Sequence, residues 1–119
     1  MNWKEAEALI CNAISVGMKL DNRTVLEGPD FPCKGYDYDG KLGFKIKIGK
    51  TTNIEVPLSM LQTVYEEARA NNGIYENRVL KSKYERQLRS HGCHVHVLGK
   101  IFEKAGIATK IDNRRYKVH

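Results

Sequence analysis

The sequence predicts an α+β fold, and three observations lead to that class. In several segments apolar residues recur every three or four positions, which is the pattern of a helix with one buried face. In others they alternate with polar residues, as in a strand with one buried face. With 119 residues, the chain has the length of one compact domain with its own core.

Residues 1–56 are predicted to form a helix and a small antiparallel sheet. The helix is expected over residues 2–17, with Gly17 as its stop. The clearest strand pattern lies in 41–56, where a strand with alternate side chains on opposite faces, a turn at 49–53 and a returning strand at 54–56 are expected to form a hairpin. The buried face of that strand would carry Leu42, Phe44, Ile46 and Ile48, and the other face Gly43, Lys45 and Lys47.

The segment between that helix and that strand is the least regular part of the chain. Residues 18–20 and 24–26 are candidates for short strands around a polar turn. Residues 28–32 are predicted to be a loop, because two prolines and a glycine there should prevent strand pairing. The dipeptide Asp39-Gly40 is typical of a hairpin turn.

The rest of the chain, residues 57–119, is predicted to form three helices followed by a two-stranded hairpin. Pro57 is expected in the first turn of the first helix, where its missing N–H costs nothing. Gly106 should end the last helix, and the strands 107–111 and 116–118 then flank the polar turn 112–115. The three helices are predicted at residues 58–71, 77–90 and 94–105.

The helix at 94–105 has the most regular pattern of the three. Its apolar stripe consists of Val95, Leu98, Ile101, Phe102 and Ala105. Three polar positions spaced by four are predicted to form a separate, exposed basic face. These positions are His96, Lys100 and Lys104. Gly99 lies between the two faces and leaves room for a close approach.

The net charge of +6 is unevenly distributed along the chain. Residues 78–119 contain eleven Lys or Arg and three Asp or Glu, a net charge of 11 − 3 = +8. Residues 1–77 contain nine and eleven respectively, a net charge of 9 − 11 = −2. This asymmetry indicates a surface for a polyanion, and the alternative is a basic surface that serves only for solubility.

The order of three helices and a hairpin over residues 58–119 resembles a winged-helix domain. The break at 90–93 is similar to the tight turn of a helix-turn-helix. The tail LGKIFEKAGIATKIDNRRYKV is similar to the end of such domains, where a recognition helix is followed by a strand, a basic wing tip and an aromatic-bearing strand. The helix before the turn is longer and more basic than usual, and the wing is shorter. Residues 1–56 resemble no such family.

The resemblance implies a small DNA-binding protein of the kind that regulates transcription. The helix 94–105 would enter the major groove of duplex DNA, and the wing tip would reach a minor groove or a phosphate. A homodimer is expected, through the 2–17 helix or the 42–56 hairpin, because short operators are commonly bound by two-fold assemblies. The alternative is a contact surface for a protein partner. The residues expected at the DNA are Lys81, Arg86, Arg89, His96, Lys100, Lys104, Arg114 and Arg115.

Two patterns suggest chemistry, and neither is predicted to perform it. His91, Cys93, His94 and His96 are potential zinc ligands, but a structural zinc site needs a second ligand pair, and His94 and His96 should point apart on a helix. Asp30, Asp39 and Lys41 resemble the acids and lysine of restriction-type nucleases, but in that family the second acid and the lysine stand on a strand. A small metal-dependent nuclease is therefore the third alternative for the function, and we predict no catalytic residue, metal or cofactor.

The sequence also predicts a cytoplasmic protein. It has no run of about 18 apolar residues that could span a membrane. Lys4, Glu5 and Glu7 precede the first apolar segment, whereas a secretory signal has a basic start without acids. The three scattered cysteines fit reduced thiols better than disulfides.

Overall fold

Four helices and seven strands are present in the computed structural model, which describes residues 1–34 and 40–119. The helices are α1 (Trp3–Ala13), α2 (Leu58–Ala70), α3 (Asn77–Ser90) and α4 (Cys93–Lys104). The strands are β1 (Lys19–Leu20), β2 (Arg23–Cys33), β3 (Lys41–Lys47), β4 (Asn53–Pro57), β5 (Ile74–Tyr75), β6 (Ala108–Asp112) and β7 (Arg115–Val118).

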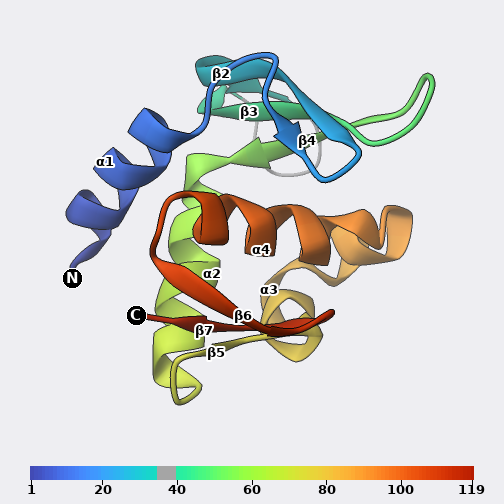
Figure 1. Cartoon of the computed structure of the whole chain (residues 1–119). Helices are drawn as coiled ribbons and strands as arrows, with labels where there is room; N and C mark the ends of the chain where they lie inside the picture. The colour runs from blue at the N-terminus through green and yellow to red at the C-terminus, as the bar shows by residue number, and fades with distance from the viewer. Residues whose placement is uncertain (35–39) are drawn as a thin grey trace.

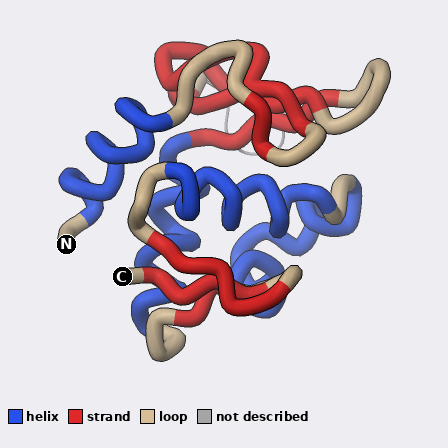
Figure 2. Tube along the Cα trace, viewed as in Figure 1, coloured by secondary structure: helices blue, strands red, loops and turns tan. Residues whose placement is uncertain are grey.

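The strands form two antiparallel sheets, which confirms the α+β class predicted from the sequence. The first sheet has the order β1-β2-β3-β4 and the second the order β5-β7-β6. Helix α4 lies between the two sheets, with α1 and α2 beside it (Figure 1). The same layering is visible when the trace is coloured by secondary structure (Figure 2).

The N-terminal helix is shorter than predicted. The Asn2 side chain accepts a hydrogen bond from the Glu5 N–H at 2.9 Å and so caps the first turn. Backbone at Ile14 is extended, so α1 ends at Ala13, four residues before Gly17. Gly17 itself has a φ of 91° and turns the chain toward β1.

The prediction of a loop at 28–32 is wrong, because β2 runs through this segment as far as Cys33. Its pairing with β3 is irregular between Glu27 and Phe31, and Pro29 falls inside that irregular stretch. The ladder therefore does not depend on the missing N–H of this proline. Of the predicted Asp39-Gly40 turn, Asp39 lies outside the described residues, and Gly40 has a φ of 74°.

Strand β3 keeps the predicted alternation at its centre. Phe44 and Ile46 are buried, whereas Lys47 is exposed. The pattern fails at its start, where Leu42 is exposed and Gly43 is buried. A Cβ at Gly43 would lie 2.3 Å from the Val56 carbonyl oxygen, so the close approach of β4 accounts for the glycine.

The three C-terminal helices and the hairpin are confirmed to within one or two residues. Pro57 precedes α2 as its N-cap instead of opening it. Helix α3 is kinked at Tyr84, whose φ and ψ are −132° and 43°. The sequence did not predict β5, which pairs with β7 and extends the hairpin to three strands.

An aromatic cluster joins α4 to the second sheet. The Tyr75 and Phe102 rings meet edge to face with 5.7 Å between centroids. The Tyr75 hydroxyl donates to the Val95 carbonyl at 2.7 Å. A Cβ at Gly99 would lie 2.2 Å from the Tyr116 ring, so the close partner of this glycine is an aromatic side chain. Buried side chains from 1–56 and 57–119 belong to one core.

Candidate nucleic-acid interface

Helix α4 does not present the exposed basic face that its sequence predicts. The Lys100 side chain is only 14% exposed, and its ammonium lies 2.8 Å from Glu103 and 3.6 Å from Asp21. His96 is half-buried, and Lys104 alone of the three is exposed. The reason is that α4 packs on β1 as well as on β6 and β7. The N-terminal sheet thus covers the side of the helix that its apolar stripe leaves free.

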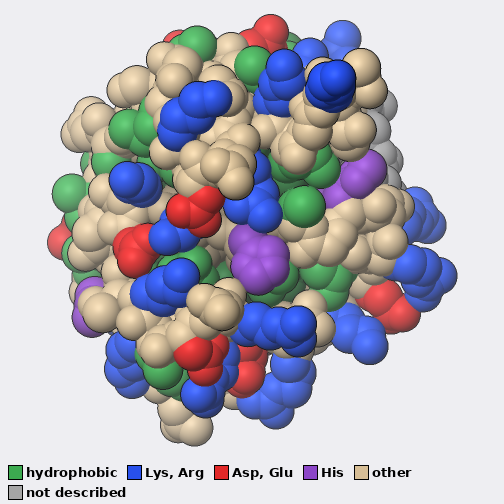
Figure 3. Space-filling view, turned by 45° about the vertical axis from the view of Figure 1, so that its right-hand side comes forward, with side chains coloured by type: hydrophobic (Ala, Val, Ile, Leu, Met, Phe, Trp, Pro, Cys, Tyr) green, Lys and Arg blue, Asp and Glu red, His purple; other side chains and the backbone are tan. Residues whose placement is uncertain are grey.

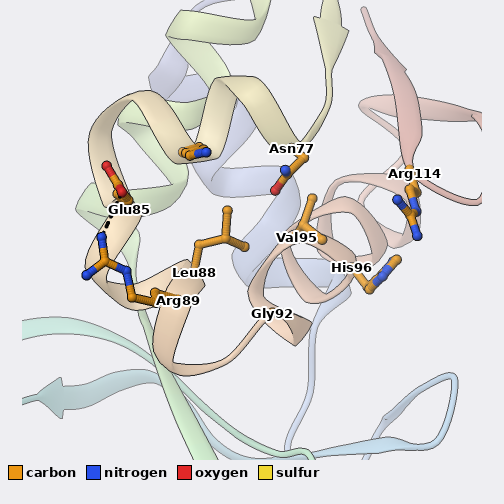
Figure 4. Close-up of a pocket in the computed structure, with 9 residues that line it drawn as sticks. Asn77, Glu85, Leu88, Arg89, Gly92, Val95, His96 and Arg114 are labelled. Carbon is orange, nitrogen blue, oxygen red and sulfur yellow. Dashed lines mark hydrogen bonds and ion pairs between the residues drawn. The ribbon is translucent and has the colours of Figure 1, made fainter.

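A concavity lies beside the first turn of α4, and we call it the α3 groove. One wall is formed by α3, and the other by the β6–β7 turn, with Arg114 above His96 (Figure 4). Leu88 and Val95 give it an apolar floor. Its volume is about 450 Å³. The lining residues are Asn77, Lys81, Glu85, Leu88, Arg89, Gly92, Val95, His96 and Arg114.

The cations of the α3 groove differ in how far acids neutralise them. Arg89 donates to Glu85 at 2.8 Å, an exposed pair one helical turn apart. Lys81 and Arg114 are exposed, and within the described residues no acidic side chain pairs with either of them. Lys and Arg side chains are spread over the face of the molecule seen in Figure 3, with acidic side chains between them.

The β6–β7 turn holds Arg114 and Arg115 in different electrostatic surroundings. The Asp112 carboxylate accepts from the Arg114 backbone N–H and from the Arg115 Nε, both at 2.9 Å. These two bonds hold the pKa of Asp112 below its usual value. The Arg115 guanidinium is therefore engaged by a carboxylate, whereas that of Arg114 is available to a ligand.

A smaller pocket adjoins the α3 groove, and we call it the His96 pocket because His96 lines both. The β1–β2 turn, α4 and the β6–β7 hairpin each contribute to it. Burial lowers the pKa of His96, and the positive charges of Arg23 and Arg114 lower it further. The lining residues are Asp21, Arg23, His96, Lys100, Lys110, Asn113 and Tyr116.

The structure brings together most, but not all, of the eight residues expected at DNA. Lys81, Arg89, His96 and Arg114 line the α3 groove. Arg115 lines a shallow extension of it beside Arg78, and Lys100 lines the His96 pocket. Arg86 and Lys104 are exposed but line none of these three concavities.

Sequence reasoning missed two cations of the His96 pocket, Arg23 and Lys110. Lys110 belongs to the basic C-terminal third, and its pairing with Tyr116 across the hairpin is the signal that could have placed it. Arg23 lies in the net-acidic part of the chain, and only the packing of the first sheet on α4 brings it to this surface.

The two chemical patterns considered in the sequence gain no support as sites. No group of three or more potential metal ligands forms among the described residues. The His94 Nδ1 lies 2.9 Å from the His91 carbonyl oxygen, and its ring is fully buried. Asp30 is exposed, and Asp39 lies outside the described residues. None of the helices in the described part of the chain is long and apolar enough to cross a bilayer.

Comparison with protein-family models, with curated proteins and with solved structures finds no match for this chain. The winged-helix resemblance therefore stays a likeness in element order.

Proposed function

We propose that this protein binds duplex DNA through the α3 groove and the β6–β7 turn. The observation that carries the proposal is the convergence of basic side chains from separate segments on one concave surface. Lys81 comes from α3, His96 from α4 and Arg114 from the turn. Unpaired Lys and Arg side chains are the groups that contact phosphates and release counterions from DNA.

The lining of the groove favours a duplex over a single strand. Proteins that bind single strands usually stack the bases on aromatic side chains. No Phe, Tyr or Trp is among the residues that line the α3 groove or its extension beside Arg78. Asn77 and Asn113 supply amide groups, which can hydrogen-bond to phosphates or base edges.

The burial of α4 changes the mode of binding from the one that the resemblance implies. The helix cannot lie along a major groove with Lys100 as a contact, because Lys100 is covered and paired. Contacts come instead from the first turn of α4 and from the turn 112–115. Such contacts reach mainly the phosphate backbone, so we expect affinity with little choice of sequence.

The test is a salt titration of binding to a labelled duplex of about 20 base pairs, because each phosphate contact contributes about 0.9 to the slope of log K against log salt. We compare the wild type with Lys81→Gln/Arg114→Gln, which removes two groove cations. The slope should fall by about 2, and the affinity near 0.1 M salt by roughly 50-fold.

The matched control is Arg86→Gln/Lys104→Gln, which removes the same two charges from outside the groove. It should retain most of the affinity. Equal losses in both double variants would show that net charge, and not this groove, drives the binding. Wild-type protein that binds no duplex at low salt would exclude the proposed function and leave a protein partner as the alternative.

A homodimer in the cytoplasm is part of the same proposal. The three cysteines are free thiols, as expected in a reducing compartment. Leu9 of α1 and Leu42 of β3 are 40% and 50% exposed, and these are the two elements expected at a dimer interface. Sedimentation with and without duplex tests the stoichiometry, and a 1:1 complex at all concentrations would exclude the dimer.

A further inference from the structure

The His96 pocket combines three segments that are distant in the sequence. Asp21 comes from the β1–β2 turn, Arg23 from the start of β2, and the half-buried His96 from the first turn of α4. Lys110 and Asn113 come from the β6–β7 hairpin. The pocket has a volume of about 200 Å³. Pockets for drug-sized ligands are typically about 300–1,000 Å³, so this one suits a small group rather than a whole nucleotide.

The charge of this pocket favours an anion. It is lined by three cationic side chains and one carboxylate, a formal charge of 3 − 1 = +2 with His96 neutral. Lys100 is already engaged by Glu103 at 2.8 Å. The Asp21 carboxylate lies 3.6 Å from Lys100 and 3.9 Å from Arg23, so its charge is divided between them. Lys110 is exposed and has no acidic partner among the described residues.

We propose that the His96 pocket holds one phosphate group of the bound duplex, contacted by Arg23, His96 and Lys110. This inference rests on the proposed function, because the phosphate is taken to belong to DNA lying in the α3 groove. His96 lines both concavities, so a strand in the groove passes directly over the pocket. The β1–β2 turn then becomes part of the interface, although its half of the chain is net acidic.

A phosphate in this pocket should change the protonation of His96. In the free protein, burial disfavours the imidazolium most, and Arg23 and Arg114 disfavour it further, whereas a hydrogen bond to the Asn113 backbone and the charge of Asp21 favour it. Lys100 and Lys110 also line the pocket, and Lys81, Glu85 and Arg89 face His96 across the α3 groove. A phosphate offsets the cations, so His96 should take up a proton from solvent when it binds. Duplex affinity should therefore rise as the pH falls from about 8 to about 6.

The experiment follows the imidazole resonances of His96 by NMR as a function of pH. The first probe is inorganic phosphate, compared with sodium chloride at the same ionic strength. Phosphate should raise the pKa of His96, and chloride should leave it unchanged. Arg23→Gln and Lys110→Gln should each weaken this response. Lys50→Gln removes one charge from an exposed loop of the same sheet and should behave like the wild type.

The second probe is the labelled duplex. Arg23→Gln should lower the affinity for the duplex about 8-fold near 0.1 M salt, because one phosphate contact is lost. Lys50→Gln should lower it by less than about 2-fold. His96→Gln should abolish the dependence of affinity on pH. Because Lys110 is exposed on a strand, Lys110→Gln keeps the test valid if replacement of the half-buried Arg23 perturbs folding.

The outcomes separate this inference from the proposed function. If the duplex binds with no dependence on pH and Arg23→Gln matches Lys50→Gln, the pocket holds no phosphate and the proposed function stands. If phosphate raises the pKa of His96 but no duplex binds, the phosphate site is supported and DNA is excluded as its source. An identical His96 titration in phosphate and in chloride overturns the site itself.

Discussion

The middle of α4 and the groove beside its first turn differ in what covers their side chains. Val97, Leu98 and Ile101 are completely buried between the two sheets. Directly before Val97, His96 is only half-buried and lies near Arg23 and Arg114. The most regular part of the sequence is therefore the core of the protein. The candidate binding surface is built around it from turns and from α3.

This contrast shows that a polar row on a helix does not by itself identify a binding face. Lys100 belongs to such a row, yet its ammonium is held by Glu103 and Asp21 beneath the first sheet. Arg114 belongs to no periodic pattern, yet it overhangs the groove, and no acidic side chain in the described part of the chain pairs with its guanidinium (Figure 4). Availability to a ligand depends on which elements cover a side chain and which acids pair with it.

The largest effect should be on the free energy of unfolding, from a substitution in the buried middle of α4. Gly99→Ala would place a methyl group 2.2 Å from the Tyr116 ring. Neither the helix backbone nor the buried ring can move aside freely, so we expect a loss of about 2 to 3 kcal/mol in the free energy of unfolding. Urea denaturation measures this loss.

Gly92→Ala is the matched control, because Gly92 is the exposed N-cap residue of the same helix. Gly92 has helical φ and ψ, and an added Cβ would have no neighbour within 4 Å. Its free energy of unfolding should change by no more than about 0.5 kcal/mol. A Gly99→Ala variant as stable as Gly92→Ala would mean that α4 and Tyr116 do not pack as described.

The next largest effect is a difference in duplex affinity between substitutions of two neighbouring arginines, Arg114 and Arg115. Arg114→Gln should lower duplex affinity about 8-fold near 0.1 M salt, because an unpaired cation is lost. Arg115→Gln should lower it by less than about 2-fold, because Asp112 already engages that guanidinium at 2.9 Å. Fluorescence anisotropy measures both affinities. The reverse order would show that Asp112 releases Arg115 when DNA binds, and that Arg114 points elsewhere.

Local structure was predictable from the sequence wherever one physical cause dominates. The three C-terminal helices follow from apolar periodicity, and Gly106, with a φ of 79°, ends the last one as predicted. The strand through 28–32 was missed, because the sequence does not show that an irregular stretch of pairing can accommodate Pro29.

The candidate site was only partly predictable, for a reason that concerns tertiary packing. Lys81, Arg89 and Arg114 were found from charge and from their place in the helix and hairpin. Arg23 could not be found, because the position of the β1–β2 turn depends on how the first sheet covers α4. The same packing covers Lys100. The packing of the first sheet on α4 thus explains both why Arg23 was missed and why Lys100 was wrongly predicted to be exposed.

His94 and His96 lie two residues apart on α4, His94 in the core and His96 at the α3 groove. His94 is completely buried, and its burial lowers its pKa. The unfolded chain therefore binds this proton more readily than the folded chain does. The free energy of unfolding should be nearly constant above about pH 6.5 and should fall below it. His96 contributes in the same direction in the free protein, but less, because it is only half-buried.

Two substitutions distinguish the roles of these histidines. His94→Leu removes the buried titration, so urea denaturation between about pH 5 and pH 8 should give a flatter profile, while duplex affinity still rises at low pH. His96→Gln should keep most of the pH dependence of the free energy of unfolding, because His94 stays in the core. It should abolish the pH dependence of duplex affinity, because the imidazole that faces the phosphate is removed. If His94→Leu also abolished the pH dependence of binding, the two sides of α4 would be coupled. The groove could then not be treated as independent of the core beneath it.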